Sequence, residues 1–411
     1  MVAVAKAGLS LEEVGNFEAL RYVAYVTTVF WLGSLGTAFL RARQETAYPQ
    51  RWFTFYLLLV ALGALATFAV FALFLPQVTR LLLDLEEAAF GVSFGVYLLG
   101  VLVGSTVEQE AIADQATDRL LGYSLSSYGL QTVLFVAPLA LGMPLYVAML
   151  GLAASAVYRL AWVGSRYLRT TDIAPPATSE LRAFGRSAGS LSIYTVGAAA
   201  VVMVDHALVT YGSPDPAAAL ALWRYGAQEL PLLLGIVVAL NVTSLAEMTG
   251  DWRGALADLR RRTRRVALGF FALAIVLVAT SSTWFGWAFS PELAPGHVLF
   301  NTLLLIVPSR LVLTTPQLVR LDLEPLMART GLLENVLNVI VSLALLPSLG
   351  LLGIAVGTVV AYSFERCVYV VLLWRRGIAP REYLDVRVWL AGSGALVLAY
   401  ALATDFSQLA S

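Results

Sequence analysis

Long apolar segments recur along the whole chain, and they constrain its fold more than any other feature. A helix that crosses a bilayer needs about 20 mostly apolar residues. Hydrophobic residues make up 59% of the 411 residues and charged residues only 13%, against about 25% charged residues in soluble domains. The sequence therefore predicts an all-α, polytopic membrane protein of about 12 transmembrane helices. The predicted segments are roughly residues 18–40, 52–75, 88–107, 122–142, 144–163, 187–210, 217–243, 266–288, 296–316, 331–348, 351–374 and 388–404.

Basic residues fall mainly in alternate connections between these segments. Twenty arginines lie in connections on one side, whereas the other side has Lys6 and Arg80. Cytoplasmic loops of membrane proteins carry the excess of Arg and Lys, so we expect the arginine-rich side to be cytoplasmic and the start of this sequence to be outside. The first residues lack the apolar core of a signal peptide. We expect a multi-pass protein of the cytoplasmic (inner) membrane.

Two cytoplasmic connections are long enough to have a structure of their own. One contains Pro175-Pro176 and separates two predicted lobes. The other, about residues 245–265, is predicted to be an amphipathic helix on the anionic inner leaflet. The predicted domains are an N-terminal transmembrane lobe (1–165), a cytoplasmic linker (166–186), a C-terminal transmembrane lobe (187–376) and an extra C-terminal helix (377–411).

An Arg-Tyr pair occurs near the outer end of two segments. Arg21-Tyr22 lies in the first segment and Arg224-Tyr225 in the seventh, and both segments start outside. Matched depth and direction indicate a parallel repeat, related by an axis along the membrane normal, as in many transporters.

Ionisable residues inside the bilayer cost about 3 kcal/mol each on insertion scales, so each needs a reason. Four of them lie toward the outer side: Arg21, Asp205, Arg224 and Glu229. One interpretation is that Arg21 and Arg224 bind an anionic headgroup, because a guanidinium donates two parallel hydrogen bonds to phosphate. Asp205 and Glu229 are then counter-ions or the site of a coupling ion. The alternative is local pairing, of Glu18 with Arg21 and of Asp205 with Arg224.

A second group of ionisable residues lies toward the cytoplasmic side. Arg310, Glu334, Glu365 and Arg366 are predicted to form a cytoplasmic gate whose ion pairs break and form again as the lobes move. The alternative is a set of static structural bridges. Glu365 and Arg366 are adjacent and point to different sides of a helix, so we expect them to have different partners. We expect Arg159, at similar depth, to snorkel to the interface.

Prolines and glycines within the segments suggest where helices bend and where they pack closely. Pro231 and Pro308 are expected to kink their helices, since each frees a backbone carbonyl. Gly100-x-x-x-Gly104 and Gly353-x-x-x-Gly357 permit close contact between helices, and we expect ordinary intramolecular packing at both.

The sequence offers no candidate for catalysis. It has no phosphate-binding glycine loop, nucleophile elbow or paired-histidine motif. A single cysteine, Cys367, excludes an intramolecular disulfide, and the isolated His206 and His297 argue against a metal site. We therefore expect a protein that is not an enzyme and that needs no cofactor.

Several stretches resemble one family of transporters. Leu9–Leu20 looks like the segment that follows the first helix in oligosaccharide flippases of the multidrug/oligosaccharidyl-lipid/polysaccharide exporter superfamily. Asp205–Val209 and Tyr225–Pro231 resemble the seventh and eighth helices of that family. Gly331–Asn338 and Gly350–Thr358 resemble its eleventh and twelfth helices. The resemblance covers most of the chain.

This resemblance implies a two-lobed helical transporter of the Wzx type. Such a protein flips polyprenyl-diphosphate-linked oligosaccharide units, of the O-antigen or exopolysaccharide type, to the outer leaflet by alternating access. Basic residues of its central cavity bind the diphosphate, and Arg21 and Arg224 match them here. Family members have six helices in each lobe, whereas this sequence starts where the second helix would begin. We therefore expect a five-helix N-terminal lobe, a six-helix C-terminal lobe and one extra C-terminal helix.

The resemblance also implies the partners. They are the lipid-linked oligosaccharide, membrane lipids, and H⁺ or Na⁺ as the candidate coupling ion, and we expect a monomer that binds no nucleic acid. A diphosphate with about two negative charges is driven outward by a potential that is negative inside, since each charge gains about 2.3 kcal/mol per 100 mV. The alternatives are a cation-coupled drug exporter of the same superfamily, a membrane-embedded polysaccharide polymerase or ligase, and a scaffold subunit that does not transport.

Overall fold

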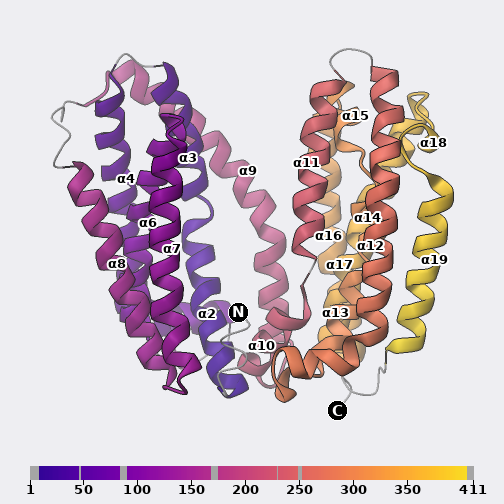
Figure 1. Ribbon diagram of the computed structural model, residues 1–411, viewed down its shortest axis with the longest axis horizontal. Helices are drawn as coiled ribbons and strands as arrows, with labels where there is room; N and C mark the ends of the chain where they lie inside the picture. The colour runs from indigo at the N-terminus through magenta and orange to yellow at the C-terminus, as the bar shows by residue number, and fades with distance from the viewer. Residues whose placement is uncertain are drawn as a thin grey trace. The chain divides into compact units, whose positions relative to one another are not determined.

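The computed structural model describes residues 9–45, 48–83, 90–167, 175–228, 230–248 and 252–404. Every regular element in these ranges is a helix, and the chain forms two compact units (Figure 1). Unit 1 is Met1–Met203 and unit 2 is Val204–Ser411. The division falls inside α9 (Thr178–Tyr211), and not at the Pro175-Pro176 link. The predicted domain boundaries therefore differ from this division and stay predictions.

The helices are long and apolar enough for a multi-pass membrane protein. Nine helices or helix runs in the described ranges pass the criteria of length and hydropathy for a membrane span, and a bent pair of helices makes a tenth. Helix α9 and the pair α10 and α11 cover the other two predicted segments. Large side chains such as Leu62, Leu125 and Leu402 are exposed on the helices, as expected for surfaces that face lipid. The predicted all-α membrane fold is confirmed.

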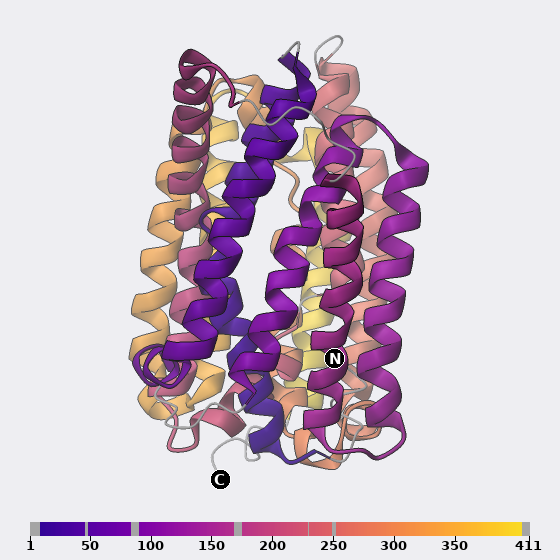
Figure 2. The same cartoon turned by 90° about the vertical axis from the view of Figure 1, so that its left-hand side faces the viewer.

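Unit 1 is a bundle whose helices run side by side (Figure 2). Its first helix, α2, begins after Ser10, whose hydroxyl accepts the N–H of Glu13 while the Glu13 carboxylate accepts the N–H of Ser10. A bend of 44° separates α2 from α3, and the two together are long and apolar enough for one broken span. The helices of unit 1 are α2 (Leu11–Thr28), α3 (Leu32–Glu45), α4 (Pro49–Ala69), which continues through a π-helical turn (Val70–Phe74) into α5 (Leu75–Leu83), α6 (Gly91–Ala113), α7 (Thr117–Ala140), α8 (Leu145–Tyr167) and the first part of α9.

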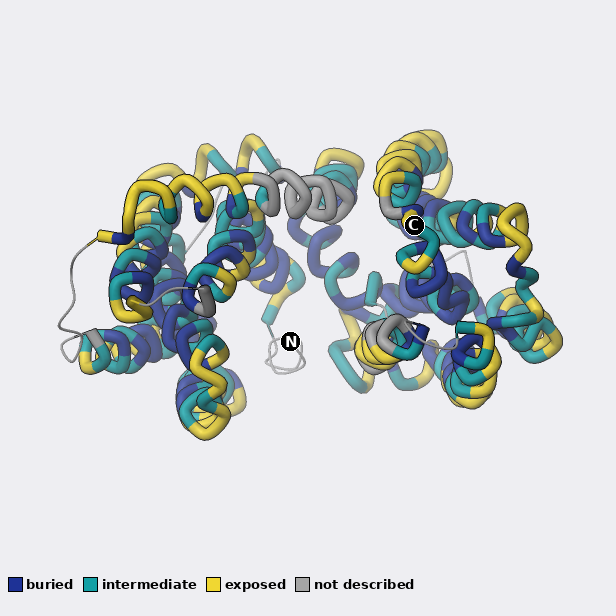
Figure 3. Tube along the Cα trace, turned by 90° about the horizontal axis from the view of Figure 1, so that it is seen from above, coloured by how far each residue is buried: buried dark blue, intermediate teal, exposed yellow. Residues whose placement is uncertain are grey.

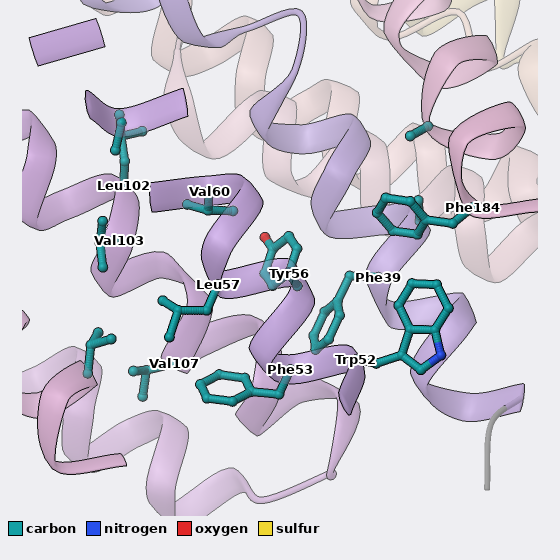
Figure 4. Packing of buried hydrophobic residues seen from close by; sticks show 14 of the residues in the cluster. Phe39, Trp52, Phe53, Tyr56, Leu57, Val60, Leu102, Val103, Val107 and Phe184 are labelled. Atoms are coloured by element: carbon teal, nitrogen blue, oxygen red, sulfur yellow. The ribbon is translucent and has the colours of Figure 1, made fainter. Parts of the chain in front are cut away.

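Aromatic and aliphatic side chains together fill the core of unit 1 (Figure 4). The Phe39 ring of α3 stacks on Tyr56 of α4, with centroids 4.3 Å apart. Trp52 of α4 lies 5.3 Å from Phe184 of α9, measured between ring centroids, so the core ties α9 to the bundle. In each unit the buried residues of neighbouring helices face one another, and the exposed residues lie on outer faces (Figure 3).

Unit 2 contains several helices that are broken inside the predicted segments. The segment predicted at 217–243 consists of α10 and α11, and the segment predicted at 296–316 consists of three short helices. After the last residues of α9, the helices of unit 2 are α10 (Pro216–Gly226), α11 (Pro231–Glu247), α12 (Trp252–Ala288), a 3₁₀ turn η2 (Pro291–Leu293), α13 (Gly296–Leu304), α14 (Val307–Arg310), α15 (Thr315–Arg320), α16 (Glu324–Leu349), α17 (Leu351–Arg375), α18 (Pro380–Tyr383) and α19 (Val386–Ala403).

Two predictions about helices in unit 2 are wrong. Pro231 is the first residue of α11 and does not kink a helix interior, because proline needs no hydrogen-bond partner for its nitrogen in the first turn. The expected surface helix at 245–265 is not a separate element, because α12 runs without a break from Trp252 to Ala288. The polar first half and the apolar second half of α12 form one continuous helix. Hydropathy alone separates them into two elements.

The extra C-terminal helix, α19, packs as part of unit 2. Its Gly392 lies against the Phe271 ring of α12, where a Cβ would overlap the ring. The indole of Trp389 donates to the carbonyl of Pro308 at 2.9 Å. That carbonyl lies in the broken region that Pro308 was predicted to create, so α19 satisfies a backbone group where the helix is interrupted.

Candidate functional site

Arg21 on α2 occupies the position in unit 1 that the sequence analysis favoured for ligand binding. Its Nη1 atom donates to both carboxylate oxygens of Glu18, at 3.0 and 2.9 Å. The local pairing expected as the alternative is therefore present. The Glu18 side chain is buried while Arg21 stays 37% exposed. Since the pair uses only Nη1, it orients the guanidinium and leaves the Nε and Nη2 donors for a ligand.

A cavity of about 370 Å³ lies beside this guanidinium within unit 1. Its polar lining comes from Arg21 on α2, Tyr97 on α6 and Gln131 on α7. Phe17 and Phe135 line another part, with their rings stacked at a centroid distance of 5.4 Å. The cavity therefore combines a cationic donor with an apolar aromatic wall, which suits an anionic group attached to an apolar one.

Arg159 on α8 lies behind this cavity, and the expectation that it snorkels to the interface is wrong. Its side chain is 1% exposed. Nη2 of Arg159 donates to Oε1 of Gln131 at 2.7 Å, and the guanidinium lies over the Tyr128 ring, 4.6 Å from the centroid. Neighbouring helices thus solvate the charge inside the unit, and it does not need to reach the interface.

Five charged residues form a network in unit 1, at the end that the predicted topology places on the cytoplasmic side. Glu110 on α6 is completely buried and accepts two hydrogen bonds from Arg166 of α8, both at 2.9 Å. Asp114, one turn later, accepts from Nε and Nη2 of Arg43 at 3.0 and 2.8 Å. Arg119 of α7 lies 3.5 Å from Glu110 and 3.3 Å from Asp114. These arginines, assigned to loops from the sequence, hold α3, α6, α7 and α8 together.

Asp205 on α9 is the most buried of the predicted site residues that the structure describes in unit 2, with 7% of its surface exposed. Its Oδ1 atom accepts from Nδ2 of Asn338 on α16 at 2.9 Å. The Oδ1 atom of Asn338 accepts in turn from Ser342 at 3.2 Å. Gly357 of α17 packs on this group, because a Cβ there would overlap the Ser342 hydroxyl and lie 3.1 Å from Asn338. The cluster is therefore a buried carboxylate at the end of a hydrogen-bonded chain, with little free space around it.

The other outer residues of unit 2 are less completely defined. Arg224 lies in the last turn of α10 and is half-buried, and its carbonyl accepts from the side chain of Gln228. The adjacent Tyr225 is buried against Phe289. Glu229 lies outside the described residues. The role of Glu229 and the joint binding of one ligand by Arg21 and Arg224 stay predictions.

The four predicted gate residues come together within unit 2. Glu334 on α16 lies within electrostatic range of Arg310, Glu365 and Arg366. The Arg310 guanidinium of α14 lies 4.0 Å from the centroid of the Tyr362 ring on α17. All four belong to one unit, and their role as a gate stays a prediction.

The expectation that Glu365 and Arg366 have different partners is wrong in part. Nη2 of Arg366 lies 3.2 Å from Oε2 of Glu365, so the neighbours on α17 form an ion pair. The long arginine side chain reaches back to a carboxylate that leaves the helix in another direction. Each also has a partner of its own: Tyr369 donates to Glu365 at 2.8 Å, and Arg366 donates to Thr314 at 3.5 Å.

Sequence reasoning missed the neutral members of both clusters. Tyr97, Gln131, Asn338 and Ser342 carry no charge, so they do not stand out in apolar segments. A usable signal was the helical spacing of Asn338 and Ser342, four residues apart and therefore on one helix face. Within the described ranges, no group of three or more His, Cys, Asp or Glu residues could hold a metal ion.

Both gly-x-x-x-gly motifs pack as expected. Gly100 of α6 lies against Ala156 of α8, where a Cβ would overlap the backbone. Gly353 of α17 lies against the backbone of Leu345 on α16, 2.7 Å from where its Cβ would be. These contacts bring α6 to α8 and α16 to α17, the helices that carry the two polar clusters.

Solved structures match the chain over nearly its whole length, although no protein-family model matches it and no curated protein matches its sequence. The lipid II flippase MurJ, in an inward closed conformation, has a TM-score of 0.73 at 13% identity, covering 98% of this chain and 88% of MurJ. An inward-facing multidrug resistance MATE family transporter of the MOP superfamily has a TM-score of 0.67 at 14% identity, covering 98% of this chain and 94% of the transporter.

A third solved structure has a similar fold. It is a MOP superfamily transporter from Pyrococcus furiosus for which reverse polarity of the binding pocket suggests a different function, with a TM-score of 0.55 at 14% identity, covering 92% of this chain and 90% of the transporter. At such identities the likeness establishes the fold. The chain has the fold of flippases and exporters of the MOP superfamily, and the resemblance drawn from the sequence is confirmed at that level.

Proposed function

We propose that this protein flips polyprenyl-diphosphate-linked oligosaccharides from the inner to the outer leaflet of the cytoplasmic membrane. The observation that carries the proposal is the cavity of unit 1, where free donors of Arg21 face an aromatic wall. A diphosphate joined to a prenyl chain offers oxygens to the guanidinium and hydrocarbon to the rings. The match in fold to a lipid II flippase supports the same substrate class.

The membrane potential supplies a direction for this transport. A diphosphate carries about two negative charges, and a potential of 100 mV, negative inside, favours outward movement by about 2.3 kcal/mol for each charge. Arg21 neutralises part of that charge in the apolar interior, where an unpaired anion is costly. Alternating access of the two lobes then carries the headgroup across while the prenyl chain stays in lipid.

The Asp205 cluster is our candidate for the coupling ion. Asp205 supplies a carboxylate, which the amide nitrogen of Asn338 contacts, and the side-chain oxygens of Asn338 and Ser342 lie one hydrogen bond further on. Oxygen ligands of this kind hold hard cations. We assign H⁺ or Na⁺ to this cluster, and Arg224 to the anionic substrate as the counterpart of Arg21.

The runner-up function is a cation-coupled drug exporter. The observation that favours it is the acidic character of unit 2, where Asp205 is buried and Glu334 lies near Glu365. A cationic drug would bind such carboxylates. The cavity of unit 1 presents the Arg21 guanidinium to its ligand. Because this positive charge repels a cationic drug, we place this function second.

The test is transport by the purified protein in vesicles with a fluorescent polyprenyl-diphosphate oligosaccharide, with a membrane-impermeant quencher reporting the flipped fraction. We expect the protein to flip the lipid. The rate of flipping should rise when an applied membrane potential drives the anionic headgroup in the direction that the assay measures. Efflux of ethidium with no flipping would support the drug exporter instead. Flipping that is unchanged after the potential is collapsed would overturn the proposed driving force.

A further inference from the structure

A chain of three polar side chains runs through unit 1 from α8 to α6. Arg159 donates from Nη2 to Oε1 of Gln131 at 2.7 Å, and Nε2 of Gln131 donates to the hydroxyl oxygen of Tyr97 at 3.0 Å. A guanidinium has donors only. Arg159 therefore fixes which end of the Gln131 amide faces it, and the NH₂ group must point to Tyr97.

This arrangement determines where the hydrogen of Tyr97 goes. The phenol oxygen accepts from Gln131, so its own O–H must donate elsewhere. No acceptor for this O–H lies within hydrogen-bond distance among the described residues. Tyr97 and Gln131 both line the 370 Å³ cavity, and Tyr97 lies within electrostatic range of Arg159 and Arg21. The O–H is thus available to a ligand in the cavity, next to Arg21.

We infer that unit 1 alone holds an oxyanion site in which Arg21 and Tyr97 contact a phosphate carried on a hydrocarbon chain. Gln131 and Arg159 are positioning residues, which act by turning the Tyr97 O–H toward the phosphate. The inference rests on the proposed function for the identity of the natural ligand. It adds the second donor and the residues that set its direction.

The rest of the lining identifies what the phosphate is attached to. Phe17 packs edge-on to Phe94 at a centroid distance of 6.3 Å, and Phe135 stacks on Phe17. Leu98 and Leu152 complete this wall. These side chains offer no hydrogen bonds to sugar hydroxyl groups, whereas they cover hydrocarbon well. The cavity therefore fits the junction of a prenyl chain with its phosphate.

The experiment measures binding of farnesyl diphosphate, inorganic pyrophosphate and farnesol to the purified full-length protein in detergent. Tyr97→Phe removes the O–H and keeps the ring, and we expect it to weaken farnesyl diphosphate about tenfold without changing farnesol binding. Tyr56→Phe is the matched control, because Tyr56 is buried in the core outside the cavity. The affinity of this variant for farnesyl diphosphate should equal that of the wild type. Equal affinity of Tyr97→Phe and wild type for farnesyl diphosphate would overturn the site.

A double-mutant cycle tests the positioning role. Gln131→Glu replaces the donor by an acceptor, so Tyr97 would donate to this side chain and no longer to the ligand. We expect Gln131→Glu to weaken farnesyl diphosphate about tenfold in the wild type and to have little further effect in Tyr97→Phe. Losses that simply add would overturn the positioning role, since they would show that Gln131 acts independently of Tyr97.

The remaining outcomes separate this site from the proposed function. Pyrophosphate bound as tightly as farnesyl diphosphate would overturn the assignment of the aromatic wall to hydrocarbon. Binding that follows these expectations in a protein that flips no lipid would uphold the site and contradict the function. Flipping with unaltered binding in Tyr97→Phe would uphold the function and overturn the site.

Discussion

The interiors of the two units differ in the charge of the ligand that each suits: an anion in unit 1 and a cation in unit 2. In unit 1, Arg21 and Tyr97 present hydrogen-bond donors to a cavity, and Arg159 lies behind them. In unit 2, the buried carboxylate of Asp205 accepts from the amide nitrogen of Asn338, whose own oxygen accepts from Ser342. Helices of similar apolar composition thus enclose opposite polarities. A binding site in such a fold is defined by a few polar side chains and not by the bundle that carries them.

The two units build these clusters in a similar way. A glycine on one helix lies against the polar side chains of the next: Gly104 against Tyr123 and Arg159 in unit 1, and Gly357 against Ser342 and Asn338 in unit 2. Close backbone approach lets short polar groups reach each other inside an apolar bundle. The comparison predicts that each unit can be disturbed without the other.

The largest expected effect concerns the charge network, for which the described part of unit 2 has no counterpart of equal size. Glu110→Gln removes a buried carboxylate that serves three arginines. We expect unfolding in denaturant to become easier by about 3 kcal/mol, as when one partner of a buried ion pair is lost. A change below about 0.5 kcal/mol, the size expected of an exposed pair, would show that the network contributes nothing to stability.

The next effect tests the acceptor cluster of unit 2. Asp205→Asn keeps the shape of the side chain and removes its charge, so we expect the affinity for the coupling cation to fall about 30-fold. Binding of radioactive Na⁺, and its competition by H⁺, measures this change. Asn338→Asp is the matched variant: it replaces the amide donor to Asp205 by a second carboxylate, so it should bind the cation at least as well as the wild type. Unchanged cation binding in Asp205→Asn would remove the contrast between the units.

A pair of glycine variants sharpens the comparison. Gly104→Ala overlaps the Tyr123 hydroxyl, and Gly357→Ala overlaps the Ser342 hydroxyl. Overpacking costs about 1–3 kcal/mol, so we expect about a tenfold loss of farnesyl diphosphate affinity in the first variant and of cation affinity in the second. Each variant should leave the other ligand unchanged. Losses of both ligands in both variants would mean that the clusters are not independent.

The smallest effect is expected at an exposed ion pair. Arg261 pairs with Asp258 three residues before it on α12, and both side chains are exposed, at 74% and 42%. Asp258→Asn should change the free energy of unfolding by less than about 0.5 kcal/mol, because water solvates both charges. This variant is also the control for Glu110→Gln in the same denaturation assay. A large loss would show that α12 depends on this surface contact.

Hydropathy predicted the fold well because membrane spans are local features. The twelve segments correspond to helices or to broken helix runs, since about 20 apolar residues suffice to identify each. Breaks were harder to predict. Pro231 begins α11 where a kink was expected, and α12 continues through a polar stretch, because backbone continuity depends on packing that hydropathy does not report.

The site was predictable only where it is charged. Arg21 and Asp205 were identified because a charge in an apolar segment needs a reason. Arg159 was misjudged because sequence gives its depth but not the helix face that meets Gln131. Partners more than 100 residues apart, such as Asp205 and Asn338, follow from helix packing, and a single sequence does not reveal it.

The most direct test of the division between the units is equilibrium binding of two ligands to one protein preparation. Farnesyl diphosphate and Na⁺ are each titrated alone into wild type, Arg21→Gln and Asp205→Asn. We expect Arg21→Gln to weaken farnesyl diphosphate by at least about tenfold and to leave Na⁺ unchanged, because it removes a charged donor. Asp205→Asn should do the reverse. Farnesyl diphosphate binding that is unaffected by Arg21→Gln, or equal loss of both ligands in either variant, would contradict the assignment of the anion to unit 1 and the cation to unit 2.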